Sequence, residues 1–400
     1  AQGADLRALL QHAVGEPARE VLALGRLLRF YLDCGRIGRA EQLFRRLSEQ
    51  TDALPGPGPH RAALGELGSA LMLARGRPDE AERLAADGLR HCPPEAAGLR
   101  CRLFAALGRA QLADGRLTDA AASFEATLDL ARETGMPRIE GEALNSLGEV
   151  AGRATRYQEA VDRFRAALQI DRELGDRAAT GTKLANLGIV YTAIGLYRRA
   201  ERYLRKALEL HEAIGHPGLL NEVVANLGEV SAELGDLQAA RSLLLQAADT
   251  AAARGDARTE LRARARLARA VLEIEGREGE AGALAEAVLA RARALGLRTA
   301  TCRALHVLSC VAERAGERER AIALEDEAVQ LIDAGAAPID GVLSIHHLGR
   351  LLAADRPDAS AARLAQAAAA VRARLEGLRD EDLRRGYLAQ AKVREILGGA

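Results

Sequence analysis

The feature that most constrains the fold is a short motif that recurs every 40 residues. It is clearest at positions 144–148, 184–188 and 224–228, which read LNSLG, LANLG and VANLG. Its leucine continues upstream at Leu67 and Leu107, and degenerate copies surround Leu27, Leu267, Leu308 and Leu348. A fixed period of this length predicts an array of stacked repeats, in which each unit contacts only its neighbours. We count about nine units.

Each unit has the pattern of two helices joined by a tight turn. In the unit that begins near position 177, apolar or small residues recur at helical spacing, namely Leu184, Leu187, Gly188 and Tyr191. Gly195 then suits the end of a helix, and a second apolar stripe follows from Ala200 to Leu208. Gly188 and Ala200 are small where the two helices must approach closely, because a larger side chain would overpack the contact.

Helix ends are marked by residues with well-understood preferences. Turns are expected at the glycines 115, 135, 175, 195, 215, 235 and 255. Asp176 and Asp256 directly follow two of these glycines and suit the N-cap position of the next helix. Pro338 and Pro357 are expected at further helix starts, and Pro217 has the same role after His216. These signals define the units independently of the leucine spacing.

The motif resembles the tetratricopeptide repeat. Leu184, Leu187, Gly188 and Tyr191 match its first helix, and Ala160 with Phe164 matches its second. The sequence departs from the family in the missing aromatic start, in the missing late proline, and in its period of 40 residues instead of about 34. The longer unit is similar to the arrays of bacterial signalling proteins and of the animal spindle-orientation adaptor. The resemblance implies an all-α, right-handed α-solenoid of about nine helical hairpins.

We expect residues 1–400 to form a single solenoid. Within it, residues 1–59 form the first hairpin and a Pro/Gly-rich turn, residues 60–256 the regular repeats, residues 257–376 degenerate repeats, and residues 377–400 a capping helix. Because stability in such an array is shared between neighbours, we expect stepwise unfolding. The chain starts at Ala1 without a methionine, and we expect it to be a mature piece or an excised region of a longer protein.

The composition excludes several classes of protein. The net charge is zero, so nothing favours binding to nucleic acid or to an anionic membrane. Apolar residues make up 48% of the chain but aromatic residues only 3%, so the core must consist of leucine and alanine. The five cysteines form no CxxC pair, and an odd number of thiols fits a reducing, cytoplasmic location. No apolar run is long enough to span a bilayer.

No motif of a catalytic or cofactor-binding site is present. The sequence lacks a P-loop, a dinucleotide-binding glycine motif, an HExxH motif and a GxSxG motif. The segment Gly181-Thr-Lys183 looks like part of a phosphate-binding loop, but it falls inside a predicted helix and lacks the upstream glycine. We therefore expect no enzymatic activity and no cofactor.

A concave groove is the better candidate for function, because the first helix of each hairpin lines the concave face of such an array. Counting from the recurring leucine of each repeat predicts which side chains face this groove: Glu142, Asn145, Glu149, Arg153, Asn186, Glu222, Asn226, Glu229, Arg266 and Arg269. The centre is expected to be acidic, with arginines at both ends.

Two asparagines occupy equivalent positions within the predicted groove. Asn186 and Asn226 lie in mid-helix, where asparagine lowers helix propensity. In the family that the chain resembles, an asparagine at this position often holds the backbone of an extended peptide. The alternative is a hydrogen bond within the hairpin, and the sequence leaves both possibilities open.

One cluster combines ligands typical of zinc sites. Cys302, His306 and Cys310 are four residues apart on one predicted helix, and His346 occupies the position of His306 one unit later, with His347 beside it. Two buried thiols beside solvated histidines would also explain the pattern, and we expect no metal here.

The function predicted from these features is that of a protein-interaction scaffold or sensor array, which binds a protein or peptide segment in its groove. The alternative is a C-terminal regulatory region of a larger bacterial kinase, STAND-type ATPase or transcription regulator, in which the array packs against its own catalytic module.

Overall fold

The computed structural model describes residues 24–29, 31, 37–52, 58–214, 217–335 and 341–398. All the regular structure among them is helical, and no strand occurs in these ranges. The fold class predicted from the sequence is thus confirmed. No helix in the described ranges is both long and apolar enough to cross a membrane. Most of the predicted first helix, the turn residues 53–57, His216 and Pro338 lie outside the described residues.

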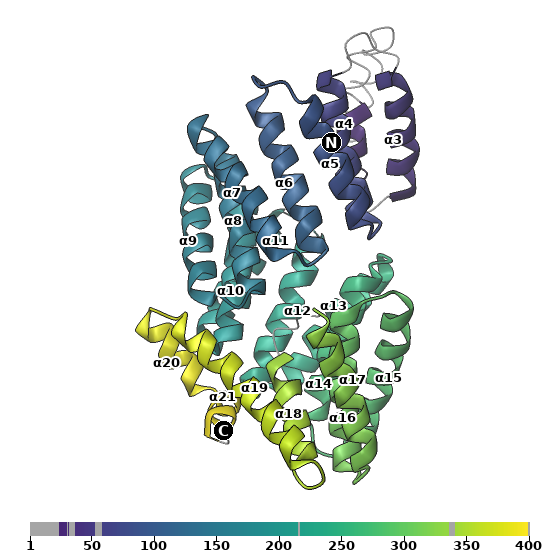
Figure 1. Ribbon diagram of the computed structural model, residues 1–400, viewed down its shortest axis with the longest axis vertical. Coiled ribbons are helices and arrows are strands. Elements are labelled where there is room, and N and C mark those ends of the chain that lie inside the picture. The colour runs from purple at the N-terminus through teal and green to yellow at the C-terminus, as the bar shows by residue number, and fades with distance from the viewer. Residues whose placement is uncertain are drawn as a thin grey trace. The chain divides into compact units, whose positions relative to one another are not determined.

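The chain divides into two compact units, residues 1–150 and 151–400. The helices of the first unit are α3 (Ile37–Asp52), α4 (Gly58–Ala74), α5 (Pro78–His91), α6 (Ala97–Ala113), α7 (Leu117–Glu133) and most of α8 (Pro137–Arg153). They form consecutive hairpins, in which α4 packs on α5 and α6 packs on α7 (Figure 1). The expectation of one continuous solenoid stays a prediction.

The second unit continues the pattern of hairpins. Its helices are α9 (Tyr157–Glu173), α10 (Arg177–Ile194), α11 (Tyr197–Ile214), α12 (Pro217–Glu233), α13 (Leu237–Ala253), α14 (Ala257–Leu272), α15 (Glu278–Ala294), α16 (Arg298–Arg314), α17 (Arg318–Asp333), α18 (Gly341–Leu352), α19 (Pro357–Glu376), α20 (Glu381–Ala389) and α21 (Ala391–Gly398). Four pairs of antiparallel helices pack closely together, namely α10 with α11, α12 with α13, α16 with α17 and α18 with α19. The segment 377–400 therefore contains two short helices.

The α20–α21 segment returns to the beginning of the second unit. Helix α20 contacts α10, and α21 contacts α19 (Figure 1). Tyr387 of α20 lies with its ring centroid 6.5 Å from that of Tyr157, and the backbone N–H of Asp380 donates to the Gln158 side chain at 3.0 Å. These contacts join positions that are more than 200 residues apart in the sequence.

Small residues allow the helices of a hairpin to approach each other. A Cβ atom added at Gly188 would lie 2.6 Å from Cγ of Leu204. This position therefore needs a small residue, as the sequence predicts. In the first unit, Gly65 on α4 lies close to Gly88 on α5. A Cβ at Gly65 would lie 2.6 Å from the carbonyl oxygen of Leu84 and 2.8 Å from Cα of Gly88.

A buried ion pair joins α9 and α10 in the second unit. Nζ of Lys183 on α10 lies 3.1 Å from Oδ2 of Asp171 on α9, and both side chains are at most 5% exposed. The Gly181-Thr-Lys183 segment lies inside α10, as expected from the sequence. Lys183 is thus held in an ion pair with Asp171 inside the fold.

Aspartates cap several helices at the positions indicated by the sequence. Oδ1 of Asp176 accepts a hydrogen bond of 3.0 Å from the backbone N–H of Ala179, and Asp256 does the same for Thr259. Asp236 caps α13 in the same way. Gly195 ends α10 in the left-handed region, with φ 84°. Pro357 begins α19, also as predicted.

Replacing Asp176 with alanine is expected to lower the free energy of unfolding by about 1 kcal/mol, because the first turn of α10 loses a side-chain acceptor. Urea denaturation of the full chain measures the change. Asp176→Asn serves as the control, since asparagine caps almost as well. Equal losses for both variants would show that the capping bond is not the cause.

Candidate functional site

The second unit contains a cavity of about 380 Å³ on the side formed by the first helices of its hairpins. Helices α12, α14, α16 and α18 contribute side chains to its wall, and α21 adds Lys392. Apolar groups such as Val307 alternate there with charged groups such as Arg266 and Glu229. The wall therefore combines apolar area with a few positioned polar groups, which is typical of a binding site.

A second, smaller cavity of about 90 Å³ continues the first. The two share Glu229, Glu233, Arg269 and Lys392. The α20–α21 segment closes one side of the smaller cavity through Tyr387, Gln390 and Val393, opposite residues of α10 and α12. Together the cavities form an elongated space whose walls include the C-terminal helices.

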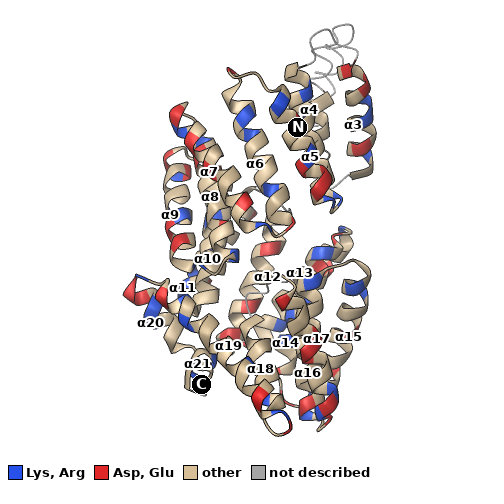
Figure 2. Ribbon diagram, viewed as in Figure 1, with Lys and Arg blue, Asp and Glu red and all other residues tan. Residues whose placement is uncertain are grey.

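Three glutamates of α12 are paired with arginines of α14, in the following repeat. Glu222 lies 3.0 Å from Arg262, and Glu229 lies 2.9 Å from Arg266. Glu233 is likewise bonded to Arg269. Figure 2 shows basic and acidic residues mixed along the helices of this region. The acidic centre expected from the sequence is therefore wrong, because basic side chains from the next repeat compensate it.

Asn226 lies at the centre of this arrangement and is only 5% exposed. Its Oδ1 accepts a hydrogen bond of 3.0 Å from Nη1 of Arg266, and its side chain lines the smaller cavity. Its Nδ2 has no hydrogen-bond partner among the described residues, and the same is true of Nε of Arg266. Burial lowers the pKa of Arg266 to about 10, even though Glu229 opposes the shift.

The structure places the remaining predicted groove residues as follows. Glu142 lines a cavity of about 80 Å³ in the first unit, together with Arg29 and Arg109. Asn145 is half-buried, and Glu149 is exposed on the same helix. Arg153 is exposed near the start of the second unit. Asn186 is half-buried on α10, outside the residues that line the two larger cavities.

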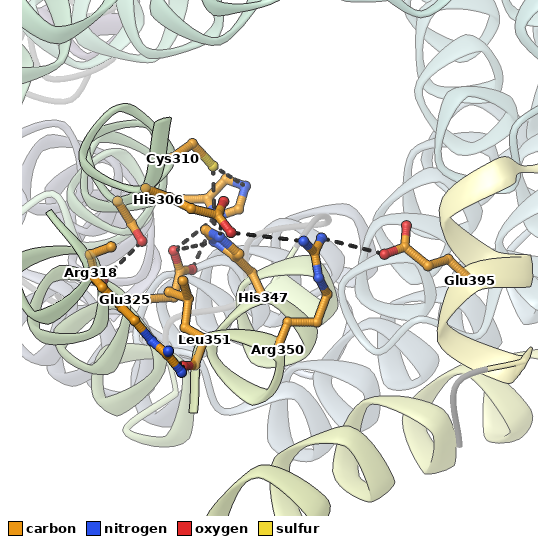
Figure 3. Close-up of polar contacts among 11 residues, drawn as sticks. His306, Cys310, Arg318, Glu325, His347, Arg350, Leu351 and Glu395 are labelled. Atoms are coloured by element: carbon orange, nitrogen blue, oxygen red, sulfur yellow. Dashed lines mark hydrogen bonds and ion pairs between the residues drawn. The ribbon is translucent and has the colours of Figure 1, made fainter. Parts of the chain in front are cut away.

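A cluster of histidine, cysteine and glutamate side chains lies beside the larger cavity (Figure 3). Sγ of Cys310 is 3.9 Å from Nε2 of His306 and 3.9 Å from Nδ1 of His347. The carboxylate of Glu325, which is fully buried on α17, reaches Nδ1 of both histidines at 3.0 Å. Nε2 of His347 also lies 3.0 Å from Oε2 of Glu313.

The cluster differs from the one that the sequence indicated. Cys302 is buried one turn before His306 and its thiol lies 3.7 Å from the carbonyl oxygen of Ala328. His346 is outside the group of converging ligand atoms, and His347 takes its place. Glu325 could not be identified from the sequence as a member of this cluster, because a single glutamate on a helix is usually exposed.

The charges in this cluster shift one another strongly. Burial opposes ionisation of His347, but its hydrogen bonds to Cys310 and Glu325 and their negative charges raise its pKa to about 10. Burial also opposes ionisation of Cys310, yet the neighbouring His306 lowers the thiol pKa to about 6. The pKa of Glu325 falls far below its usual range, against the effect of burial, because both histidines face it.

Residues 139–213 match the sequence pattern of the tetratricopeptide repeat. None of the curated proteins matches the chain. A Rap protein solved in complex with the competence and sporulation factor has a similar structure, with TM-score 0.69 and 12% identity over 90% of this chain and 99% of that chain.

Two further solved structures have the same fold. The quorum sensor NprR, crystallised with its cognate peptide NprX, gives TM-score 0.59 and 14% identity over 90% of this chain and 99% of that one. A STAND protein with a tetratricopeptide repeat sensor, from Pyrococcus horikoshii, gives 0.54 and 16% identity over 81% of this chain and 50% of that one. Residues 139–213 therefore carry the sequence pattern of the tetratricopeptide repeat, and the chain shares its fold with these solved structures.

Proposed function

We propose that the second unit binds an extended peptide segment in the elongated space between its first helices and the α20–α21 segment. The observation that carries this proposal is Asn226, whose amide nitrogen is buried at the cavity wall without a partner among the described residues. A buried donor without an acceptor costs about 1–3 kcal/mol, so a ligand that supplies the acceptor binds favourably.

The unpaired groups favour a peptide as the ligand. Nδ2 of Asn226 and Nε of Arg266 are both donors, and the carbonyl groups of an extended backbone are the matching acceptors. Apolar wall residues such as Val307 and Ile189 would contact its side chains. The similar structures of a Rap protein with a signalling factor and of NprR with its cognate peptide support the same class of ligand.

We propose binding without catalysis. The charged groups of the cavity wall are engaged with one another, as in the pair of Glu229 with Arg266 and that of Glu233 with Arg269. Groups held in such pairs position and select a ligand, but they are poorly placed to transfer protons. The expected cytoplasmic location stays a prediction.

Substituting Asn226 with alanine is expected to weaken peptide binding by about 5- to 150-fold, which corresponds to the loss of one to two hydrogen bonds to the ligand. The probe is a peptide selected against the full chain from a randomised library of unstructured peptides. Its dissociation constant is measured by calorimetry for the wild type and for the variant.

The matched control is Asn221, which is one turn away on α12 and also buried. Its Nδ2 donates to the carbonyl oxygen of Ala247 at 2.9 Å, so it serves the packing of α12 against α13. Asn221→Ala should lower the melting temperature and keep peptide affinity in the folded protein. A library that yields no binder, or a selected peptide that binds Asn226→Ala as tightly as the wild type, contradicts the proposal.

The alternative function is that of a regulatory array within a larger signalling protein. The likeness to the tetratricopeptide repeat sensor of a STAND protein, of which this chain spans 50%, favours it. In that case the occupant of the groove would be a segment of the attached catalytic module. Peptides from the remainder of the full-length protein, tested in the same calorimetric assay, distinguish the two functions.

A further inference from the structure

Three potential metal ligands converge in the second unit, away from the unpaired donors of the proposed peptide site. They are Nε2 of His306 and Sγ of Cys310 on α16, and Nδ1 of His347 on α18 (Figure 3). All the ligand atoms of this group lie within 4.8 Å of one another. His306 and Cys310 are four residues apart, which puts them on one face of their helix.

We propose that His306, Cys310 and His347 bind a divalent transition-metal ion of the zinc type. One thiolate and two imidazoles form a ligand set that suits Zn²⁺, and a fourth, non-protein ligand such as water would complete a tetrahedron. The proposal does not depend on peptide binding, since it uses other side chains.

The distances suit a tetrahedral ion after small movements. Zinc bonds of about 2.3 Å to sulfur and about 2.0 Å to nitrogen place these two atoms about 3.5 Å apart in a tetrahedral site. The two sulfur–nitrogen distances in the structure are 3.9 Å each. Closing these two distances takes less than half an ångström for each side chain, and the two nitrogens, which lie within 4.8 Å of each other, must approach to about 3.3 Å. Such a shift is within the reach of small rotations about the side-chain bonds.

The surrounding carboxylates hold both histidines in the orientation that a metal requires. Glu325 lies 3.0 Å from Nδ1 of His306, so that ring can donate there and present Nε2 to an ion. Glu313 lies 3.0 Å from Nε2 of His347 and can accept from it, while Nδ1, which lies 3.0 Å from Oε2 of Glu325, would exchange that carboxylate for the ion. Carboxylates that accept from the outer nitrogen of a ligating histidine are the usual support of zinc sites.

The charges of the site remain balanced when an ion binds. Glu325 is fully buried, and Cys310 would enter the site as a thiolate. Without an ion the protonated histidines balance these two negative charges, and a dication with two neutral histidines would balance them equally. The site is also accessible, because His306 lines the larger cavity.

The test is cobalt and zinc binding by the full chain, purified without a metal-binding tag. Titration with Co²⁺ should give one equivalent bound, with visible ligand-field bands and a near-ultraviolet charge-transfer band from thiolate to cobalt. Zn²⁺ should displace the cobalt and raise the melting temperature by mass action. Cys310→Ser should lose the charge-transfer band, and His347→Gln should bind cobalt at least tenfold more weakly.

The chain provides matched controls for Cys310 and His347. Cys302→Ala and His346→Gln change a thiol on the same helix and the histidine next to His347, and both should leave the cobalt spectrum unchanged. Circular dichroism confirms that each variant is folded. Absence of stoichiometric cobalt from the wild type would overturn the proposal, and this result needs no variant. Equal losses in the Cys302 and Cys310 variants would overturn it as well.

Discussion

Replacing Lys183 with methionine is expected to lower the free energy of unfolding of the second unit by about 3–5 kcal/mol. The substitution keeps the length of the side chain but leaves the carboxylate of Asp171 buried without its cation. An uncompensated charge in the interior is among the most costly single changes in a protein. Urea denaturation measures the loss, and hydrogen exchange of the α9 and α10 amides assigns it to this unit.

The double variant Lys183→Met with Asp171→Leu separates the cost of the orphaned charge from the value of the pair. It should recover most of the loss, to within about 1 kcal/mol of the wild type, because apolar residues can replace a buried ion pair at little cost. If the double variant is as unstable as Lys183→Met, the loss comes from packing and not from charge.

Gly65→Ala is expected to destabilise the first unit by about 3 kcal/mol, at the upper end for overpacking by one methyl group. The added Cβ would meet backbone atoms of α5, the Leu84 carbonyl and Gly88, and backbone cannot rotate out of the way as a side chain can. Helices α4 and α5 would have to separate along their whole contact. Thermal denaturation followed by circular dichroism measures the effect.

Gly38 supplies the control for that experiment. It lies in helix α3 of the same unit, and an added Cβ there meets nothing within 4 Å. Gly38→Ala should leave stability unchanged or raise it by up to about 1 kcal/mol, since alanine is the better helix former. A loss at Gly38 as large as that at Gly65 would mean that steric overlap is not the cause.

The fold was predictable because its determinants are local and repeated. Asp176 and Asp256 cap the helices that follow them, Gly195 ends α10, and Gly188 packs under Leu204. Each of these contacts lies within one hairpin, so a single repeat contains all the information. The return of α20 to α10 was not predictable, because its contacts join residues that no periodicity relates.

The candidate metal cluster shows where reasoning by equivalent positions fails. His306 and His346 occupy the same place in successive repeats, and equivalent side chains point in parallel directions. Such side chains contact each other only where they are long enough to span the distance between two repeats. His347 is turned by about 100° around its helix relative to His346. It therefore faces Cys310, 3.9 Å away, across the boundary between repeats.

The same geometry explains the charge of the groove. Arg262 and Arg266 lie 40 residues after Glu222 and Asn226, in equivalent positions, and still make contact with them at 3.0 Å. Arginine is long enough to reach the equivalent position in the neighbouring repeat. Counting charges repeat by repeat thus predicted an acidic centre, although the neutralising side chains come from the neighbouring repeat.

The return of the C-terminal helices also changes how the second unit should fold. A linear array depends on contacts between neighbours, so its repeats can form and melt one after another. The backbone of Asp380 bonds to Gln158, and the ring of Tyr387 packs against Tyr157. These contacts raise the contact order of the unit above that of a linear array and link its last helices to its first. We therefore expect the second unit to fold slowly and to unfold as one cooperative body, not repeat by repeat.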